Sequence, residues 1–299
     1  MNEMYYYRAF GLTIESELVI PQVPPIPPCM PDVRIITADL SGEKPDRKKL
    51  LVDNGNMVYT TSSTVFRVTH GSLIEADIMP GEAESYVAVY LLGSCMGSIL
   101  IQRGFMLLHG SCVTNGRHAV LITGDSGAGK STMAAEFLKH GWKLITDDVT
   151  TVFDVETSPM VRSSYPSQKL WRDALEHYER PKEDVYSLFT TGGREKFGVD
   201  VTRFFHDGVS PLSMIVRLSA EPAGRGLYPM EGAAKIDQLM RNTYRINYIP
   251  IADRQRHFQR CVTLSTKVPM ALAIRENGKQ CADVLYALIT KHLEETYHD

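Results

Sequence analysis

The sequence has few cysteines, and none stands in a spacing that metal or disulfide chemistry requires. The five cysteines (Cys29, Cys95, Cys112, Cys261 and Cys281) are odd in number and scattered, and no C-x-x-C pair occurs. This pattern argues against a disulfide framework and a zinc site, and it is typical of free thiols in a reducing compartment. We therefore expect a cytoplasmic protein.

A basic stripe and a long apolar run are also missing. The 32 lysines and arginines are balanced by 35 acidic residues, for a net charge of −3. Binding to nucleic acid needs dense positive charge, so no nucleic-acid partner is expected. The apolar stretch 90–108 is broken by glycine, glutamine and arginine, and the N-terminus lacks the basic-then-apolar order of a signal peptide. No membrane partner is therefore expected, whereas the 43% hydrophobic content is sufficient for a globular core.

Two regions are predicted, a β-rich region over residues 1–90 and a catalytic domain over 91–299. β-Branched and aromatic residues predict strands within 5–20 and over 32–36, 57–61, 64–69 and 72–78. The proline-rich stretch 23–31 is incompatible with a helix or a central strand, so it is either a stiff extended connector or a P-x-x-P docking ligand. Apolar spacing predicts a helix from Glu84 to about Ile101.

The second region alternates strands and helices, which predicts an α/β fold with a mixed central sheet flanked by helices. Strands are expected over 105–113, 119–123, 143–146, 149–153 and 212–218, and helices over 169–178, 236–244 and 281–293. Trp171 is expected to pack in the core rather than to stack on a base. Residues 182–195, with Gly192 and Gly193, suggest a mobile loop, and 221–232 another loop. Arg241 and Arg245 would share a helical face, turned to phosphate or to solvent.

The clearest motif lies between a predicted strand and a predicted helix. Residues 124–131 match G-x-x-x-x-G-K-[ST] in full, and the nucleotide-binding loop comprises Gly124, Asp125, Ser126, Gly127, Ala128, Gly129, Lys130, Ser131 and Thr132. Gly127 and Gly129 allow turns that aim consecutive N–H groups at phosphates, and the helix dipole favours the negative charge there. Lys130 would reach the β- and γ-phosphates and the Ser131 hydroxyl would bind Mg²⁺. The motif thus predicts a site for a nucleoside triphosphate with Mg²⁺ and leaves open whether the nucleotide is ATP or GTP.

Two adjacent carboxylates, Asp147 and Asp148, follow the next predicted strand. One can hold Mg²⁺ and the other can accept the proton of an attacking hydroxyl, because neighbouring strand residues point to opposite faces. The predicted metal ligands are Ser131 and Asp148, although the sequence leaves open which aspartate is the base.

His109 is a third candidate catalytic residue. If Asn115-Gly116 forms a two-residue hairpin turn, His109 stands opposite Ile122, close to the start of the phosphate loop. It would then contact a γ-phosphate or tune the base. A histidine that serves only as a hydrogen-bonded structural residue is the alternative.

In combination, these residues resemble the catalytic core of HPr kinase/phosphorylase. The resemblance rests on His109-Gly110-Ser111, the loop Leu121–Ser131, and Ile145-Thr146-Asp147-Asp148. It implies a P-loop kinase core that uses ATP and Mg²⁺, a catalytic group formed by His109, Asp147, Asp148 and Lys130, and a serine hydroxyl as acceptor. It also implies closed homo-oligomers.

The flanking residues are similar to a divergent branch of that family, the lasso-peptide kinases, which phosphorylate the C-terminal serine of a precursor peptide. The chain has no counterpart of the family's E-I-R-G-x-G stretch, which is linked to phosphorolysis. The similar segments are 7–18, 165–171, 194–197 and 268–270. Arg194 and Lys196 are candidates for charge stabilisation or for binding the acceptor, although a solvated turn would also suit them. An HPr-type kinase, a small-molecule kinase and a nucleotide-gated binding module are the alternatives.

Overall fold

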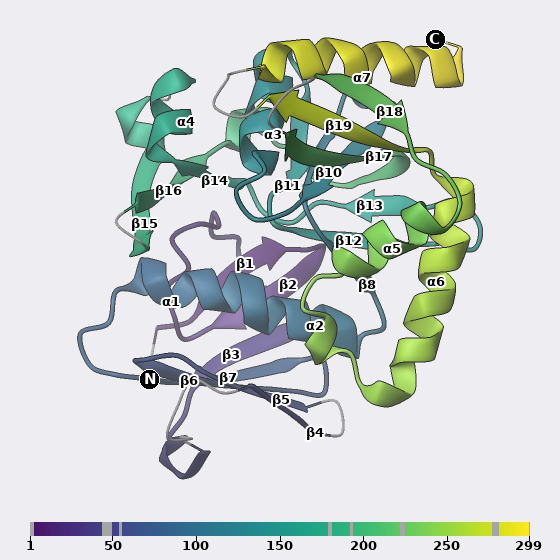
Figure 1. Cartoon of the computed structure of the whole chain (residues 1–299). Coiled ribbons are helices and arrows are strands. Elements are labelled where there is room, and N and C mark those ends of the chain that lie inside the picture. The colour runs from purple at the N-terminus through teal and green to yellow at the C-terminus, as the bar shows by residue number, and fades with distance from the viewer. Residues whose placement is uncertain are drawn as a thin grey trace.

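The N-terminal strands form one seven-stranded sheet in the lower half of Figure 1. The structure is a computed structural model that describes residues 3–43, 50–53, 56–178, 181–191, 194–221, 225–276 and 281–298. In spatial order the strands are β1 (Tyr5–Ala9), β2 (Leu12–Ser16), β3 (Val33–Thr37), β7 (Leu73–Ile78), β6 (Thr64–Thr69), β5 (Asn56–Thr60) and β4 (Leu50–Asp53). Every segment predicted as a strand here is one. The division of the chain at residue 90 stays a prediction.

The proline-rich connector lies along the outer edge of β1. The Ile26 N–H donates a hydrogen bond to the Tyr6 carbonyl oxygen at 2.8 Å, and Tyr7 and Pro25 form an isolated bridge. Because prolines offer no donor, such a segment can cover a sheet edge without extending the sheet.

One continuous helix covers this sheet and also contacts the second one. It consists of α1 (Glu84–Tyr90), the π-helical turn η2 (Leu91–Cys95) and α2 (Met96–Gln102). By length and mean hydropathy (1.4) the 19 residues Glu84–Gln102 would be sufficient to cross a membrane, yet 67% of that window is buried inside the protein. Its buried side chains share one core with the first sheet and with Leu107 and Val149 of the second half.

The second sheet is mixed and carries the phosphate loop. Its order is β11 (Lys143–Thr146), β9 (Ser111–Thr114), β10 (Ala119–Gly124), β17 (Val209–Glu221), β13 (Met160–Arg162), β12 (Val149–Phe153) and β8 (Met106–His109), with β19 (Met270–Glu276) beside β17 and β18 (Gly226–Pro229) beside β19. The β10–β17 and β17–β19 pairs are parallel and the other pairs are antiparallel.

Helices cover both faces of this sheet (Figure 1). Val120 and Ile122 of β10 pack in one core with α3 (Lys130–Lys139) and α7 (Ala282–Tyr297). The alternate residues Ala119 and Leu121 pack in another core with α5 (Ala233–Arg241) and α6 (Arg254–Lys267). A strand buried on both faces by alternate residues is a central strand, which confirms the predicted α/β class.

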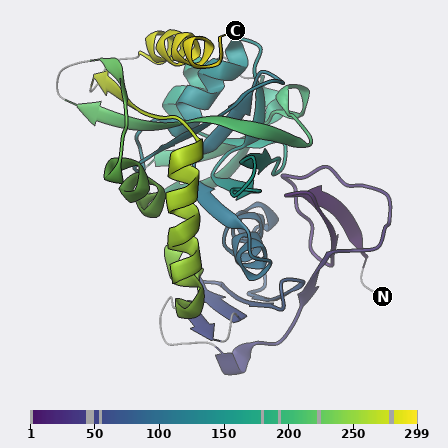
Figure 2. The same ribbon diagram turned by 90° about the vertical axis from the view of Figure 1, so that its right-hand side faces the viewer.

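The helix α6 was not predicted, because most of its residues are polar. Its buried residues His257, Cys261 and Leu264 recur at helical spacing, and they form only a narrow apolar stripe. Figure 2 shows α6 running beside the continuous helix Glu84–Gln102. There Arg260 Nη1 donates to the Gly104 carbonyl oxygen at 2.8 Å.

A third, three-stranded sheet corrects two predictions. Its order is β14 (Ser167–Trp171), β16 (Arg194–Asp200) and β15 (Val185–Thr191), so the predicted helix 169–178 begins only with α4 (Arg172–His177) and the predicted loop 182–195 is mostly strand. The physical reason is cross-strand pairing: β16 supplies backbone partners to both β14 and β15, which local apolar spacing does not reveal. Gly192 and Gly193 lie outside the described residues.

The predicted hairpin register was wrong by two residues. Asn115 Oδ1 accepts hydrogen bonds from the N–H groups of Arg117 and His118, which makes a four-residue loop and pairs Thr114 with Ala119. The predicted strand 105–113 is also divided at Gly110, so His109 pairs with Val149 of β12 instead of lying across the hairpin.

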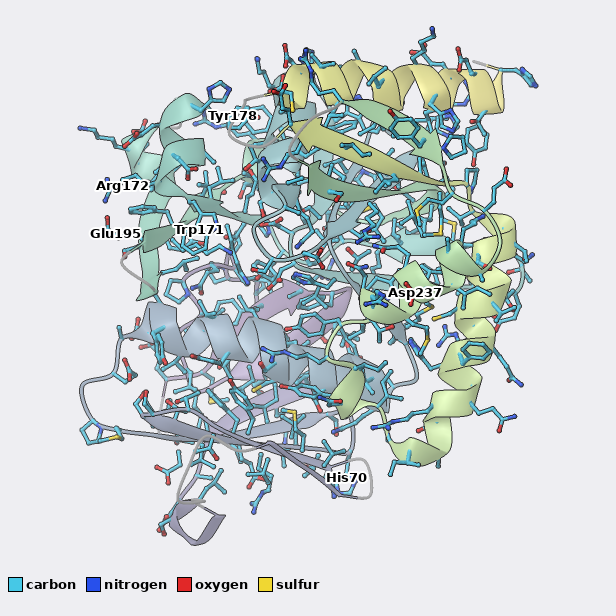
Figure 3. The ribbon with its side chains drawn as sticks, in the orientation of Figure 1. His70, Trp171, Arg172, Tyr178, Glu195 and Asp237 are labelled. Atoms are coloured by element: carbon cyan, nitrogen blue, oxygen red, sulfur yellow. The ribbon has the colours of Figure 1, made fainter. Side chains whose placement is uncertain are left out.

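Two smaller predictions in the last third of the chain were also wrong. The loop 221–232 contains β18, and α5 ends at Arg241, so Arg245 does not share its helical face. Arg241 forms an ion pair with Asp237 at 2.7 Å on the exposed side of α5, and Figure 3 labels Asp237 there. Arg245 has a positive φ of 49° just beyond the helix.

Candidate functional site

The phosphate loop joins the end of β10 to the start of α3, as predicted. Gly127 and Gly129 have φ angles of 82° and 102°, the conformation that favours glycine. A Cβ at Gly124 would stand 2.5 Å from the Leu218 carbonyl oxygen, so only glycine fits where the loop leaves the sheet. Lys130 Nζ donates to the carbonyl oxygens of Gly124 and Asp125 at 2.9 and 3.1 Å and lies across the loop.

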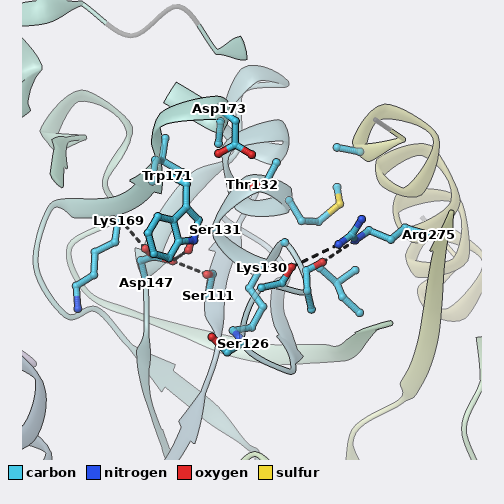
Figure 4. A pocket seen from close by; sticks show the side chains of 18 of the residues that line it. Ser111, Ser126, Lys130, Ser131, Thr132, Asp147, Lys169, Trp171, Asp173 and Arg275 are labelled. Atoms are coloured by element: carbon cyan, nitrogen blue, oxygen red, sulfur yellow. Dashed lines mark hydrogen bonds between the residues drawn. The ribbon is translucent and has the colours of Figure 1, made fainter. Parts of the chain in front are cut away.

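Arg275, at the end of β19, binds two carbonyl groups of this loop (Figure 4). Its Nε donates to the Ala128 carbonyl oxygen at 2.9 Å and its Nη2 to that of Gly127 at 3.4 Å. Carbonyl groups that point outward leave the N–H groups of the same peptide planes directed inward, where an anion can meet them. Arg275 therefore orients the loop, and no local signal in the sequence identifies it, since 147 residues separate it from Ala128.

Asp147 faces the phosphate loop and is buried, with 3% of its surface exposed. Its Oδ1 accepts hydrogen bonds from the Ser131 hydroxyl at 3.0 Å and from the Ser111 hydroxyl, and its Oδ2 accepts one from the Lys169 N–H at 2.8 Å. The hydroxyl predicted to bind Mg²⁺ therefore lies next to Asp147, and Asp148, the predicted metal ligand, faces other partners.

Asp148 points to the opposite side and forms a cluster with Lys169 and His109. Its Oδ2 lies 2.8 Å from Lys169 Nζ and its Oδ1 lies 3.1 Å from His109 Nδ1. Burial would raise the pKa of Asp148, but Lys169 and His109 hold it well below its usual value. Burial would also lower the pKa of Lys169, but the Asp148 carboxylate raises it above its usual value. These two neighbours therefore favour the ionised form of the carboxylate, which accepts hydrogen bonds.

The position of strand β8 places His109 beside this cluster, and the predicted hairpin does not. Its N–H donates to the Asn242 carbonyl oxygen at 2.7 Å, and Asn242 Oδ1 accepts the Gly124 N–H at 3.1 Å. Asn242 is 92% buried, and it fixes both the candidate histidine and the first residue of the phosphate loop. Asn242 was not predicted, since only the tertiary fold brings it there.

Two further cationic groups come from the three-stranded sheet. Lys169, on β14, was not predicted as a site residue. Lys196, on β16, was predicted, and its Nζ lies 5.1 Å from the centre of the Trp171 ring. Burial lowers the pKa of Lys196. Trp171 is partly exposed and lines the site, so the prediction that it packs in the core was wrong. The side chain of Arg194 lies outside the described part of the chain.

These groups surround one cavity of about 630 Å³, part of which is shown in Figure 4. Its charged wall includes His109, Lys130, Asp147, Asp148, Lys169, Lys196 and Arg275. Its more apolar wall comes from β14, α4 and the start of α7 and includes Leu170, Trp171, Ala174, Ala282 and Leu285. Beside it, Arg172 and Glu195 form an ion pair on the surface (Figure 3). A cavity with one polar and one apolar wall suits a nucleotide.

The oxygen atoms fit Mg²⁺ better than a transition metal. In the described part of the chain no group of three or more His, Cys, Asp or Glu residues could hold a metal ion. Mg²⁺ instead keeps several waters and takes one or two protein oxygens together with phosphate oxygens. Ser131 and Asp147 offer that pair, in contact with a loop whose N–H groups suit phosphates.

One family profile matches the part of the chain that carries most of this site. Residues 103–176 match the family profile described as "HPr Serine kinase C-terminal domain". This segment is therefore similar to the HPr serine kinases. It covers His109, the phosphate loop, both aspartates and Lys169, but not Lys196 or Arg275, so the match extends over only part of the charged wall of the cavity. The lasso-peptide branch is not distinguished by this match.

Curated relatives agree with the profile. An "HPr kinase/phosphorylase" of Clostridium beijerinckii is 43% identical over 56 residues, which are 19% of this chain and 18% of the relative. The protein of that name from Lacticaseibacillus casei is 30% identical over 144 residues, which are 44% of each chain. The chain thus spans less than half the length of these curated relatives. A solved "Hpr(Ser) kinase/phosphatase" from Coxiella burnetii is 12% identical with a TM-score of 0.34, over 64% of this chain and 93% of that one.

Proposed function

We propose that this protein is a Mg²⁺–ATP-dependent serine kinase whose acceptor is the C-terminal serine of a precursor peptide. The observation that carries the phosphotransferase part is the separation of two adjacent carboxylates. Asp147 contacts Ser131 of the phosphate loop, whereas Asp148 contacts His109 and Lys169. Two carboxylates in different environments are suited to different tasks.

In this proposal the chain's own groups position the reactants and stabilise charge. Bound Mg²⁺ would neutralise charge on the β- and γ-phosphates, with Ser131 and Asp147 as its protein ligands. Lys130 and the loop N–H groups would hold the phosphates, and Asp148 would accept the proton of the serine hydroxyl. Lys169 and His109 keep that carboxylate ionised and in place. Lys196, which faces the same cavity, would stabilise charge on the transferred group.

The acceptor is supported by resemblance rather than by geometry. The segments 7–18 and 165–171 resemble the lasso-peptide kinases, and these include Lys169. An HPr-like protein is the second candidate, because the curated relatives bear that name. We further propose a cytoplasmic location and a homo-oligomer, as the family resemblance implies.

Mass spectrometry of the acceptor tests this proposal. Peptides that end in serine, an HPr protein and small alcohols would each be incubated with the protein, ATP and Mg²⁺. We expect a gain of about 80 Da, one phosphoryl group, on the terminal serine, abolished in Lys130→Ala and Asp148→Asn. Amidation of the C-terminus and replacement of the serine by alanine are the matched peptide controls.

The other outcomes separate the alternatives. Transfer to HPr alone would replace the peptide by the second candidate, and transfer to a small alcohol alone would indicate a small-molecule kinase. Tight ATP binding with no transfer to any acceptor would contradict a kinase and support a nucleotide-gated binding module.

A further inference from the structure

One arginine outside the phosphate site carries a charge that the described structure does not neutralise. Arg245 follows α5 and is exposed, and its guanidinium donates a hydrogen bond of 3.4 Å to Ser94 Oγ. No carboxylate among the described residues forms an ion pair with it. Its φ of 49° is a conformation that residues other than glycine adopt at a cost in free energy. The fold thus holds this guanidinium in place without supplying an anion.

The guanidinium lies among tyrosines contributed by three separate elements. Its central carbon is 5.7 Å from the ring centre of Tyr244 and 5.8 Å from that of Tyr248. The charge of Arg245 also acts on Tyr59 of β5 and Tyr90 of α1. The ring centres of these two tyrosines are 5.8 Å apart, and the Tyr90 hydroxyl lies 2.9 Å from that of Tyr86. Tyr59, Tyr86 and Tyr90 are partly exposed. We call Arg245 with Tyr59, Tyr86 and Tyr90 the Tyr–Arg surface.

This surface is close to the proposed site of transfer. The Tyr244 ring lies between the two, with its centre 6.2 Å from the centre of the His109 ring. The guanidinium carbon lies 5.7 Å from the centre of the same Tyr244 ring. These two distances together set an upper limit on the separation between the guanidinium carbon and the centre of the His109 ring. An extended peptide advances roughly 3.3 Å per residue, so roughly three or four residues cover that span.

We infer that the Tyr–Arg surface binds the acceptor peptide through an acidic side chain that lies about three residues before the phosphorylated serine. This inference rests on the proposed function and extends it to the sequence around the acceptor. A guanidinium without an anionic partner suits a carboxylate, which it can bind through two parallel N–H groups. Tyrosine and arginine are also the residues that most often dominate binding at protein interfaces.

A peptide series measures this preference directly. Serine-ended peptides would carry one glutamate at each of the six positions before the serine, and each would have a glutamine counterpart. In the wild-type protein, kcat/KM should be about ten-fold higher for glutamate than for glutamine near the third position and similar elsewhere. Arg245→Gln should abolish the difference, and Arg245→Glu should favour a lysine at the same position.

Arg241→Gln is the matched control, since Arg241 lies four residues away and is already paired with Asp237. It should keep the glutamate preference. Circular dichroism would verify that each variant is folded. Equal kcat/KM for all glutamate and glutamine peptides in the wild-type protein, or a preference that survives in Arg245→Gln, would overturn the inference.

Fluorescence anisotropy of the same labelled peptides without nucleotide keeps the two proposals distinguishable. If glutamate peptides bind more tightly than glutamine peptides and Arg245→Gln removes this preference, the Tyr–Arg surface is supported. This holds even if no peptide is phosphorylated, and the absence of phosphorylation would contradict only the kinase proposal. Phosphorylation without any glutamate preference would contradict the inference and leave the kinase proposal standing.

Discussion

Asp147 and Asp148 are neighbours in the chain, yet the structure gives them different surroundings. Hydroxyl and amide donors surround Asp147, which suits a carboxylate that shares a metal ion with Ser131. Lys169 and His109 surround Asp148, which has a positive φ of 97° that directs it away from its neighbour. The sequence predicts the pair but leaves the division of tasks open, because the deciding partner, Lys169, comes from another strand.

Removal of the Lys169 charge should change the pH dependence of the reaction. The ammonium group lowers the pKa of Asp148, so Lys169→Met should raise that pKa and move the acidic limb of the kcat/KM profile to higher pH. Lys169→Arg keeps the charge and should leave the limb close to its wild-type position. An unchanged limb in Lys169→Met would exclude Asp148 as the proton acceptor.

The same ion pair should make stability depend on pH. The pKa of Asp148 is lowered on folding, so its contribution is present above the unfolded carboxyl pKa of about 3.9 and is lost as the pH falls through the folded value. Urea denaturation at pH 7 and pH 3 should show a larger loss of unfolding free energy in the wild-type protein than in Asp148→Asn. Equal losses would contradict the ion pair.

At the scale of elements, the site depends on a crossing between β8 and β9. The chain leaves one strand partner and joins another at Gly110, where a Cβ would stand 2.5 Å from the Ile122 carbonyl oxygen. The phosphate loop could be predicted because its motif and its flanking strand and helix are local. The hairpin register, the strand β14 and the role of Asn242 could not, because they depend on residues far apart in the sequence.

Gly110→Ala should therefore destabilise the protein. The methyl group would press on a backbone oxygen that cannot move freely, so we expect the unfolding free energy to fall by about 2 kcal/mol. Gly42→Ala is the control, since a Cβ there meets nothing within 4 Å. Urea denaturation measures both, and equal effects of the two substitutions would contradict the close approach at Gly110.

The end of β19 should control nucleotide affinity through Arg275. Arg275→Gln removes the two donors that orient the loop carbonyls, and we expect the Kd for Mg²⁺–ATP to rise about ten-fold. Calorimetric titration would measure it, with exposed Arg203→Gln as a charge-matched control. An unchanged Kd in Arg275→Gln would show that the loop is oriented without this contact.

At the scale of the whole molecule, two large sheets are joined through the helix Glu84–Gln102 (Figure 1). Residues of the second sheet and of the adjoining three-stranded sheet line the cavity. Composition and alternation predict both sheets and this helix. They do not predict that the helix shares its core with residues of the second half, such as Tyr244 and Tyr248.

Nucleotide binding should stabilise this assembly as a whole. A ligand at 100 times its Kd adds about 2.7 kcal/mol to the unfolding free energy, so Mg²⁺–ATP should raise Tm by several degrees. Differential scanning fluorimetry would show the shift. Lys130→Ala should reduce it strongly, and a full shift in that variant would mean that the nucleotide binds elsewhere.

The four residues 242–245 have a consequence for regulation. Asn242 holds the first amide of the phosphate loop, Tyr244 packs beside His109, and Arg245 belongs to the Tyr–Arg surface. A peptide that displaces this segment would also displace a partner of the nucleotide loop, so the two ligands would be thermodynamically coupled. Such coupling is reciprocal: whatever factor the peptide applies to ATP affinity, ATP applies to the affinity for the peptide.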